Sequence, residues 1–141
     1  MSPGSKAALA QKVWRLMFDF LLESAPQRSK SLGKRGLTPN DSRALTSLDA
    51  SAGRPMRELA EAWECDASNA TWIVDRLEKL GLAERRNVEH DRRIKHVVLT
   101  AAGQRLKSEL ADEFYTPPEK LLKLDRDTLD ELYRALTKLG A

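Results

Sequence analysis

Three features of the sequence predict a mainly α-helical fold with one β-hairpin. Apolar residues recur at helical spacing in several separate segments, which is typical of amphipathic helices. After Gly81 this period gives way to two short extended runs around a polar hinge, as expected for a hairpin. The chain has 141 residues, 41% of them apolar and 32% charged, so one core can form without a metal or a disulfide.

The N-terminal segment predicts a long helix at residues 7–23, with Leu9 and Leu16 on an apolar stripe that Trp14 widens. A helix that packs on its own domain needs an apolar stripe of only about 100°. The wider apolar arc of this helix therefore predicts that a second surface also covers it, most simply that of another copy of the chain. The polar residues 25–36, which include a proline and two glycines, are predicted to form a loop.

Three shorter helices are predicted in the middle of the chain. The first begins at Thr38, whose side chain can cap it, and the second covers about residues 57–63. The third covers residues 67–80, after the capping residue Asp66. Because the hairpin follows directly, this order predicts a winged helix-turn-helix.

The C-terminal segment predicts two more helices. Thr100 caps one that reaches about Tyr115, and Asp125 caps an amphipathic last helix. The predicted organisation is one integrated domain with three parts: an N-terminal dimerisation helix and linker at 1–36, the winged helix-turn-helix at 37–100, and C-terminal dimerisation helices at 101–141.

Composition narrows the class of function. The net charge of +3 is small and its excess lies in the first 37 residues, so charge alone does not identify a nucleic-acid surface. The sequence contains no glycine-rich phosphate loop, no nucleophile elbow and no histidine placed to serve a serine or cysteine, so we expect no enzyme. The single cysteine, the lack of a signal segment at residues 1–5 and the shortness of the apolar stretches predict a cytoplasmic protein outside membranes.

The helix at 67–80 has two chemically different faces. Counting about 100° per residue from Ser68, the side chains of Asn69, Trp72 and Arg76 share a polar face. The opposite arc is apolar and is predicted to pack on the core: Leu80, Ile73, Leu77, Ala70 and Val74.

The polar face suits the major groove of DNA, which admits a helix. Asn69 matches adenine, Arg76 matches guanine or a phosphate, and Trp72 can lie against a thymine methyl or a sugar. A solvated helix face is the simpler interpretation of the same pattern, but the hairpin that follows favours DNA contact.

Four motifs in this order resemble the MarR family of bacterial winged-helix regulators, over about residues 37–110. They are Met56-Arg57-Glu58-Leu59-Ala60, Asp66 to Glu78, Gly81-Leu82-Ala83-Glu84-Arg85-Arg86, and His90-Asp91-Arg92-Arg93 through Leu99 to Gly103. The resemblance implies a homodimer clasped by its terminal helices, with recognition helices in successive major grooves of double-stranded DNA and wings in the flanking minor grooves.

The resemblance also assigns residues to these parts. Arg92 and Arg93 fall on the wing, where an arginine can read a narrow minor groove, and Asp91 is the acid beside them. Arg85 and Arg86 lie on the strand that leads to the wing tip and are candidates for phosphate contacts. The recognition helix carries Ser68, Asn69, Thr71, Trp72 and Arg76. Family members often have a basic or small polar residue at the position of Trp72, so no known operator sequence can be transferred.

The implied function is that of a ligand-responsive repressor, a homodimer that binds a pseudo-palindromic operator. Members of the family often bind a small aromatic or phenolic effector near the junction of the dimerisation helices and the DNA-binding lobe. Trp14 and Phe18 are candidates to line such a pocket, although a role in the dimer core is the favoured interpretation.

Two other functions remain open. The exposed helix face and wing could contact a protein instead of DNA, because residues 55–100 carry a slight negative charge. Cys65 could sense oxidants, but no second cysteine is available to resolve a sulfenic acid. His90 and His96 do not form a ligand pattern with Cys65, so no metal site or other cofactor is predicted.

Overall fold

The computed structural model describes residues 4–88 and 91–140, and only the backbone of residues 88 and 91–93. The chain divides into two units, one of Ala25–Phe114 and one of Met1–Ser24 with Tyr115–Ala141. The predicted winged helix-turn-helix, residues 37–100, lies wholly within the first of these, together with a helix on either side of it.

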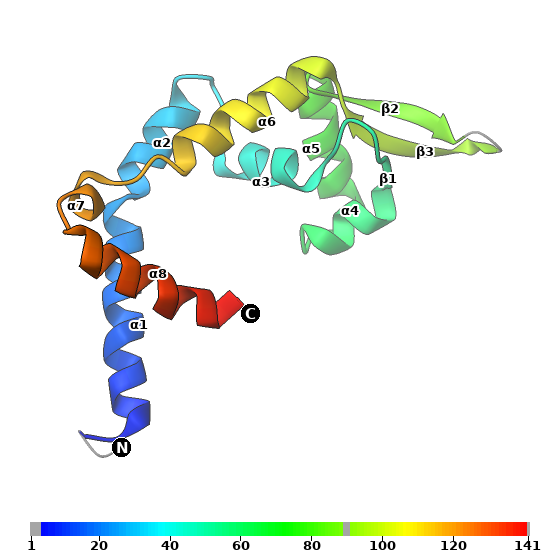
Figure 1. The fold of residues 1–141 in the computed structure, drawn as a ribbon. Coiled ribbons are helices and arrows are strands. Elements are labelled where there is room, and N and C mark those ends of the chain that lie inside the picture. The colour runs from blue at the N-terminus through cyan, green and yellow to red at the C-terminus, as the bar shows by residue number, and fades with distance from the viewer. Residues whose placement is uncertain (1–3, 89–90, 141) are drawn as a thin grey trace. The chain divides into compact units, whose positions relative to one another are not determined.

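The larger unit consists of helices beside a small antiparallel sheet from which a hairpin projects (Figure 1). The strand order is β1-β3-β2, with Arg54 of β1 opposite Val97 and Ala83 of β2 opposite Leu99. The elements are α2 (Ala25–Gly33), α3 (Pro39–Ser47), β1 (Arg54–Pro55), α4 (Met56–Ala62), α5 (Ala67–Lys79), β2 (Ala83–Val88), β3 (Asp91–Leu99) and α6 (Ala101–Phe114).

The predicted caps position the helices of this unit. The Thr38 hydroxyl oxygen accepts from the backbone N–H of Asp41 at 3.1 Å, and the Asp41 side chain accepts from the backbone N–H of Thr38 at 2.8 Å. The Asp66 side chain caps α5 by accepting from the backbone N–H of Asn69 at 2.7 Å, and the Thr100 hydroxyl oxygen caps α6 by accepting from the backbone N–H of Gly103 at 3.1 Å. Gly81, with φ of +76°, ends the turn after α5, because a left-handed conformation favours glycine.

The core of the larger unit lies between α3, α4, α5, α6 and the inner face of the sheet. Helix α5 contributes its predicted apolar arc: Ala70, Ile73, Val74 and Leu77 are all buried. The prediction for Leu80 was wrong, since this side chain is 44% exposed. Leu80 is the C-cap residue and stands at the edge of the apolar arc, where the helix has already ended.

The predicted loop at 25–36 is also wrong in part, because residues 25–33 form α2. Leu32 of α2 is buried in the core, which a frayed segment would not allow. At the end of the helix, Arg35 bonds the carboxylate of Glu113 on α6 with an Nη2–Oε1 distance of 2.8 Å. These partners are distant in sequence, so local polarity did not reveal the helix.

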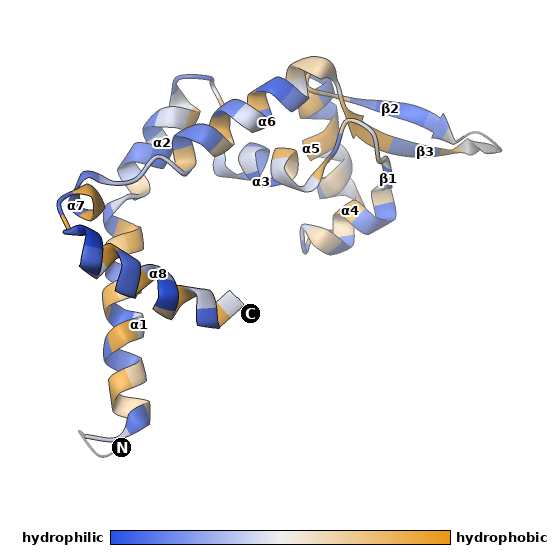
Figure 2. Ribbon diagram, in the orientation of Figure 1, coloured by the Kyte–Doolittle hydropathy of each residue, from blue (hydrophilic) through white to orange (hydrophobic). Residues whose placement is uncertain are grey.

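The smaller unit contains α1 (Lys6–Glu23), α7 (Glu119–Leu122) and α8 (Arg126–Gly140). Asp125 caps α8 as predicted, accepting from the backbone N–H of Thr128 at 2.7 Å. Neither α1 nor α8 has a buried residue. Apolar residues nevertheless recur along both helices (Figure 2). Within the described residues, no helix is both long and apolar enough to cross a membrane.

Candidate nucleic-acid interface

Helix α5 presents the predicted polar face to solvent. Ser68, Asn69, Thr71 and Trp72 are all exposed, while the opposite side of the helix is packed in the core. The Ser68 hydroxyl donates to Asp66 at 2.8 Å. The backbone N–H of Asn69, and then the Ser68 hydroxyl, hold the pKa of the Asp66 carboxyl below its usual value. The first turn of the helix is therefore capped, and the side chains of Asn69, Thr71 and Trp72 are exposed beside it.

Arg76 has partners inside the chain. Its Nε donates to both carboxylate oxygens of Asp41, at 3.0 and 3.1 Å, and its Nη2 donates to the carbonyl oxygen of Gly36 at 3.1 Å. Asp41 is only 1% exposed. Two of the three guanidinium nitrogens thus bind the start of α3 and the residue Gly36 before it. In this geometry the guanidinium does not present a bidentate pair of donors to guanine.

The environment of Asp41 keeps it ionised. Burial by itself raises the pKa of this carboxyl, but the hydrogen bonds from Arg76 and from the backbone of Thr38 outweigh burial and hold the pKa below its usual value. A buried carboxylate is tolerated only when its oxygens are satisfied. The same residue therefore caps α3 and anchors α5.

Arg85 connects the hairpin to helix α5. Its guanidinium forms ion pairs with Asp75, at 2.8 Å, and with Glu78, both on α5, and its side chain is only 21% exposed. Arg86 is more exposed and pairs with Glu84 on its own strand, at 2.6 Å. The two arginines therefore differ, because Arg85 is bound between two elements and Arg86 lies on the surface.

The residues predicted to contact DNA from the wing tip lie at the start of β3. Asp91, Arg92 and Arg93 begin β3, but their side chains lie outside the described part of the structure, as does His90. The roles predicted for these residues stay predictions.

One side chain on the exposed face was missed by the sequence reasoning. Lys79 is exposed and lines a surface hollow of about 360 Å³ together with Trp72, Asp75 and Arg76. On the helical wheel it stands only about 20° from Ser68, so the pattern contained the signal. Lys79 extends the polar face by two turns beyond Trp72.

The remaining candidates lie elsewhere. Trp14 and Phe18 are 61% and 45% exposed on α1, with ring centroids 5.9 Å apart, and only Trp14 lines the hollow of about 520 Å³ between α1 and α8. Cys65 is half-buried and packs against the core before α5. Among the described residues no cluster of histidine, cysteine and acidic side chains could hold a metal ion.

Comparison with known proteins finds similar chains among transcription regulators. A family model described as MarR family matches residues 35–94. The transcriptional repressor MprA of Escherichia coli is 31% identical over 120 residues, which cover 77% of this chain and 65% of that protein. The chain thus spans just under two thirds of that repressor's length.

Two solved structures share the fold. The YusO protein from Bacillus subtilis is 26% identical with a TM-score of 0.76, over 96% of this chain and 97% of that one. A complex of MepR from S. aureus with DNA has a TM-score of 0.73 at 20% identity, over 89% of this chain and 96% of that one.

Proposed function

We propose that the chain belongs to the MarR family and is a transcriptional regulator rather than an enzyme, a repressor that binds double-stranded DNA. The observation that carries this proposal is the exposed face of α5, where Asn69, Thr71 and Trp72 project from a helix whose other side is buried. Such a face offers hydrogen-bonding groups and an apolar ring to base edges in the major groove. The solved MepR–DNA complex, which has the same fold, supports this use.

We assign different tasks to the side chains of this face. Asn69 pairs with adenine, Ser68 and Thr71 contact base edges or phosphates, and Lys79 neutralises a phosphate. Arg76 acts mainly as a positioning residue, because Asp41 and Gly36 take its Nε and Nη2.

The hairpin serves as the wing in this proposal. Arg92 and Arg93, with Asp91 beside them, enter a minor groove, where a narrow groove attracts arginine. Arg85 holds the wing to α5, and the exposed Arg86 can exchange Glu84 for a phosphate.

The working form is a homodimer. Helices α1 and α8 expose large apolar side chains, among them Leu16 at 72%, Tyr133 at 72% and Leu139 at 73%. Large exposed apolar side chains in such numbers indicate an interaction site. A second copy joined by a two-fold axis would cover it and would present two α5 helices to half-sites about 10–10.5 bp apart on a pseudo-palindromic operator.

A small aromatic or phenolic effector would regulate this dimer in the cytoplasm. It shifts the equilibrium only if it binds more tightly to a dimer whose recognition helices no longer match the half-sites. Trp14 and Phe18 serve the dimer core in this proposal. The effector would occupy the part of the α1–α8 hollow that the second copy does not fill.

Selection of bound fragments from a random DNA pool tests the proposal. One pseudo-palindromic sequence should be enriched, and its affinity should fall steeply with added salt as counterions are released. Asn69→Ala should weaken binding to that sequence by about 5- to 150-fold per half-site, the range for one bidentate base contact. Ser108→Ala is the matched control, because Ser108 lies on the exposed side of α6, and this variant should bind the selected DNA with wild-type affinity. The absence of an enriched sequence, or affinity indifferent to salt, would contradict the proposal.

A further inference from the structure

The larger unit contains two tryptophans in opposite environments. Trp63 is 2% exposed, and its Nε1–H donates to the hydroxyl of Ser47 at 2.8 Å. Trp72 is 61% exposed, and its Nε1–H has no hydrogen-bond partner within the part of the chain that the structure describes. A buried indole normally satisfies its N–H, as Trp63 does, whereas Trp72 contributes neither its ring nor its N–H to the core.

The core holds the backbone at Trp72 in place, and the indole ring offers a flat apolar surface to solvent. The adjacent Ile73 and Val74 are 7% and 0% exposed, so the backbone that carries Trp72 is held by the core. The charged groups one turn further along α5 are neutralised, since Asp75 pairs with Arg85 at 2.8 Å and Arg76 pairs with Asp41. The indole therefore presents an apolar surface and one donor between Asn69 and Lys79.

The geometry points to Trp72 as a specificity-determining residue that selects an A·T pair by packing against the 5-methyl group of thymine in the major groove. This inference rests on the proposed function. Thymine alone carries an apolar methyl group on its major-groove edge, and its O4 acceptor stands beside that methyl group. The indole N–H is a donor only, so thymine satisfies both parts of the side chain.

The other bases fit less well. Cytosine presents an amino donor in the major groove, which would oppose the indole N–H, and guanine presents acceptors without an apolar group. Adenine combines an acceptor with a donor and has no methyl group. Trp72 thus distinguishes bases by chemistry that Asn69, a hydrogen-bonding side chain, does not possess.

Uracil substitution tests the inference directly, because it removes the methyl group and keeps every hydrogen-bonding atom. Each thymine of the selected operator is replaced by uracil in turn, at both symmetry-related positions. Wild-type affinity should fall about fourfold per half-site at one position, the effect of a single buried methyl group at ~0.8 kcal/mol. In Trp72→Ala the thymine and uracil operators should bind equally.

Two further variants keep the result interpretable. Asn69→Ala should weaken binding to both operators by the same factor, so the ratio of the affinities for the thymine and uracil operators stays near fourfold per half-site. Trp72→Phe should retain part of that ratio while losing the indole N–H. Because Trp72 is exposed, Trp72→Ala should leave the thermal midpoint of unfolding close to the wild-type value.

The possible failures are distinct. Operator binding that no uracil substitution weakens would overturn the role of Trp72 and leave the proposed function standing. Methyl discrimination that survives in Trp72→Ala would assign it to another residue and would also overturn the inference. Failure to select any DNA sequence would overturn the proposed function itself, and the inference with it.

Discussion

Asp41→Asn should destabilise the larger unit and weaken DNA binding through the same contact. The buried Asp41 carboxylate accepts from Nε of Arg76 at 3.0 and 3.1 Å and from the backbone N–H of Thr38 at 2.8 Å. Asparagine has nearly the same shape but only one acceptor oxygen, and its amino group is a donor. The substitution therefore removes the charge that Arg76 faces and turns a donor towards another donor.

The size of the loss follows from the burial of the two partners. A hydrogen bond to a charged group contributes ~1.5–3 kcal/mol, and breaking a fully buried ion pair costs ~3–5 kcal/mol. The Arg76 side chain is 32% exposed and can regain water, whereas that of Asp41 is 2% exposed. We therefore expect the free energy of unfolding to fall by about 2–3 kcal/mol, and the thermal midpoint by roughly 4–12 °C.

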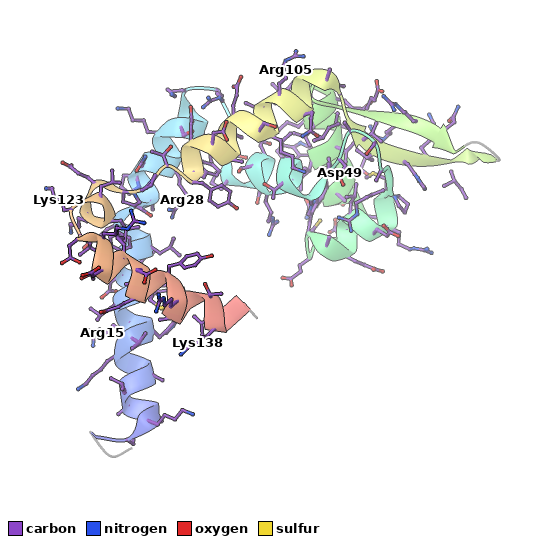
Figure 3. All side chains as sticks on the ribbon, in the orientation of Figure 1. Arg15, Arg28, Asp49, Arg105, Lys123 and Lys138 are labelled. Atoms are coloured by element: carbon purple, nitrogen blue, oxygen red, sulfur yellow. The ribbon has the colours of Figure 1, made fainter. Side chains whose placement is uncertain are left out.

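Urea unfolding followed by circular dichroism measures this loss of stability, and the m-value should be the same as that of the wild type. Combining Asp41→Asn with Arg76→Gln in a double-mutant cycle should show strong non-additivity, because both changes break one contact. Arg105→Gln is the matched control, since Arg105 projects from the exposed side of α6 (Figure 3). Operator affinity should fall in Asp41→Asn although Asp41 is too buried to touch DNA. A stability within about 0.5 kcal/mol of wild type, or purely additive effects, would refute the reasoning.

Three other substitutions follow from local geometry. Hydrogen bonds from Arg35 lower the pKa of Glu113 from 4.5 to about 2, so this carboxylate stabilises the fold above pH 4.5 and the stabilisation is lost as the pH falls towards 2. Glu113→Gln should lack that acid-dependent loss in urea midpoints; identical pH profiles would contradict it. Glu64 has φ of +51°, so Glu64→Gly should raise stability by about 0.5–1 kcal/mol in thermal unfolding, and a lower midpoint would argue against backbone strain there. Gly103→Ala should cost about 1–3 kcal/mol, because a methyl group would collide with the carbonyl oxygen of Leu82; unchanged stability would mean that the loop yields.

The candidate site was predictable where one helix suffices to define it. The wheel drawn for α5 predicted the buried arc, apart from Leu80, and the exposure of Ser68, Asn69 and Trp72, because helical geometry depends only on spacing. The same wheel could have predicted the position of Lys79 on the exposed face. Helix α2 could not be predicted from local spacing, because Leu32 and Arg35 contact segments that lie far along the chain.

The arginines illustrate what a local sequence pattern cannot predict, namely the ion-pair partners of a charged side chain. Spacing and capping chemistry place Arg76 on the α5 helix and Arg85 on the β2 strand, where both are candidates for contact with DNA. Folding brings Asp41, 35 residues earlier in the chain, to 3.0 Å from Arg76, and brings Asp75 to 2.8 Å from Arg85. Electrostatic attraction depends on distance in space, which no local pattern records, so the partners of these charges emerge only when the helices and the hairpin pack together.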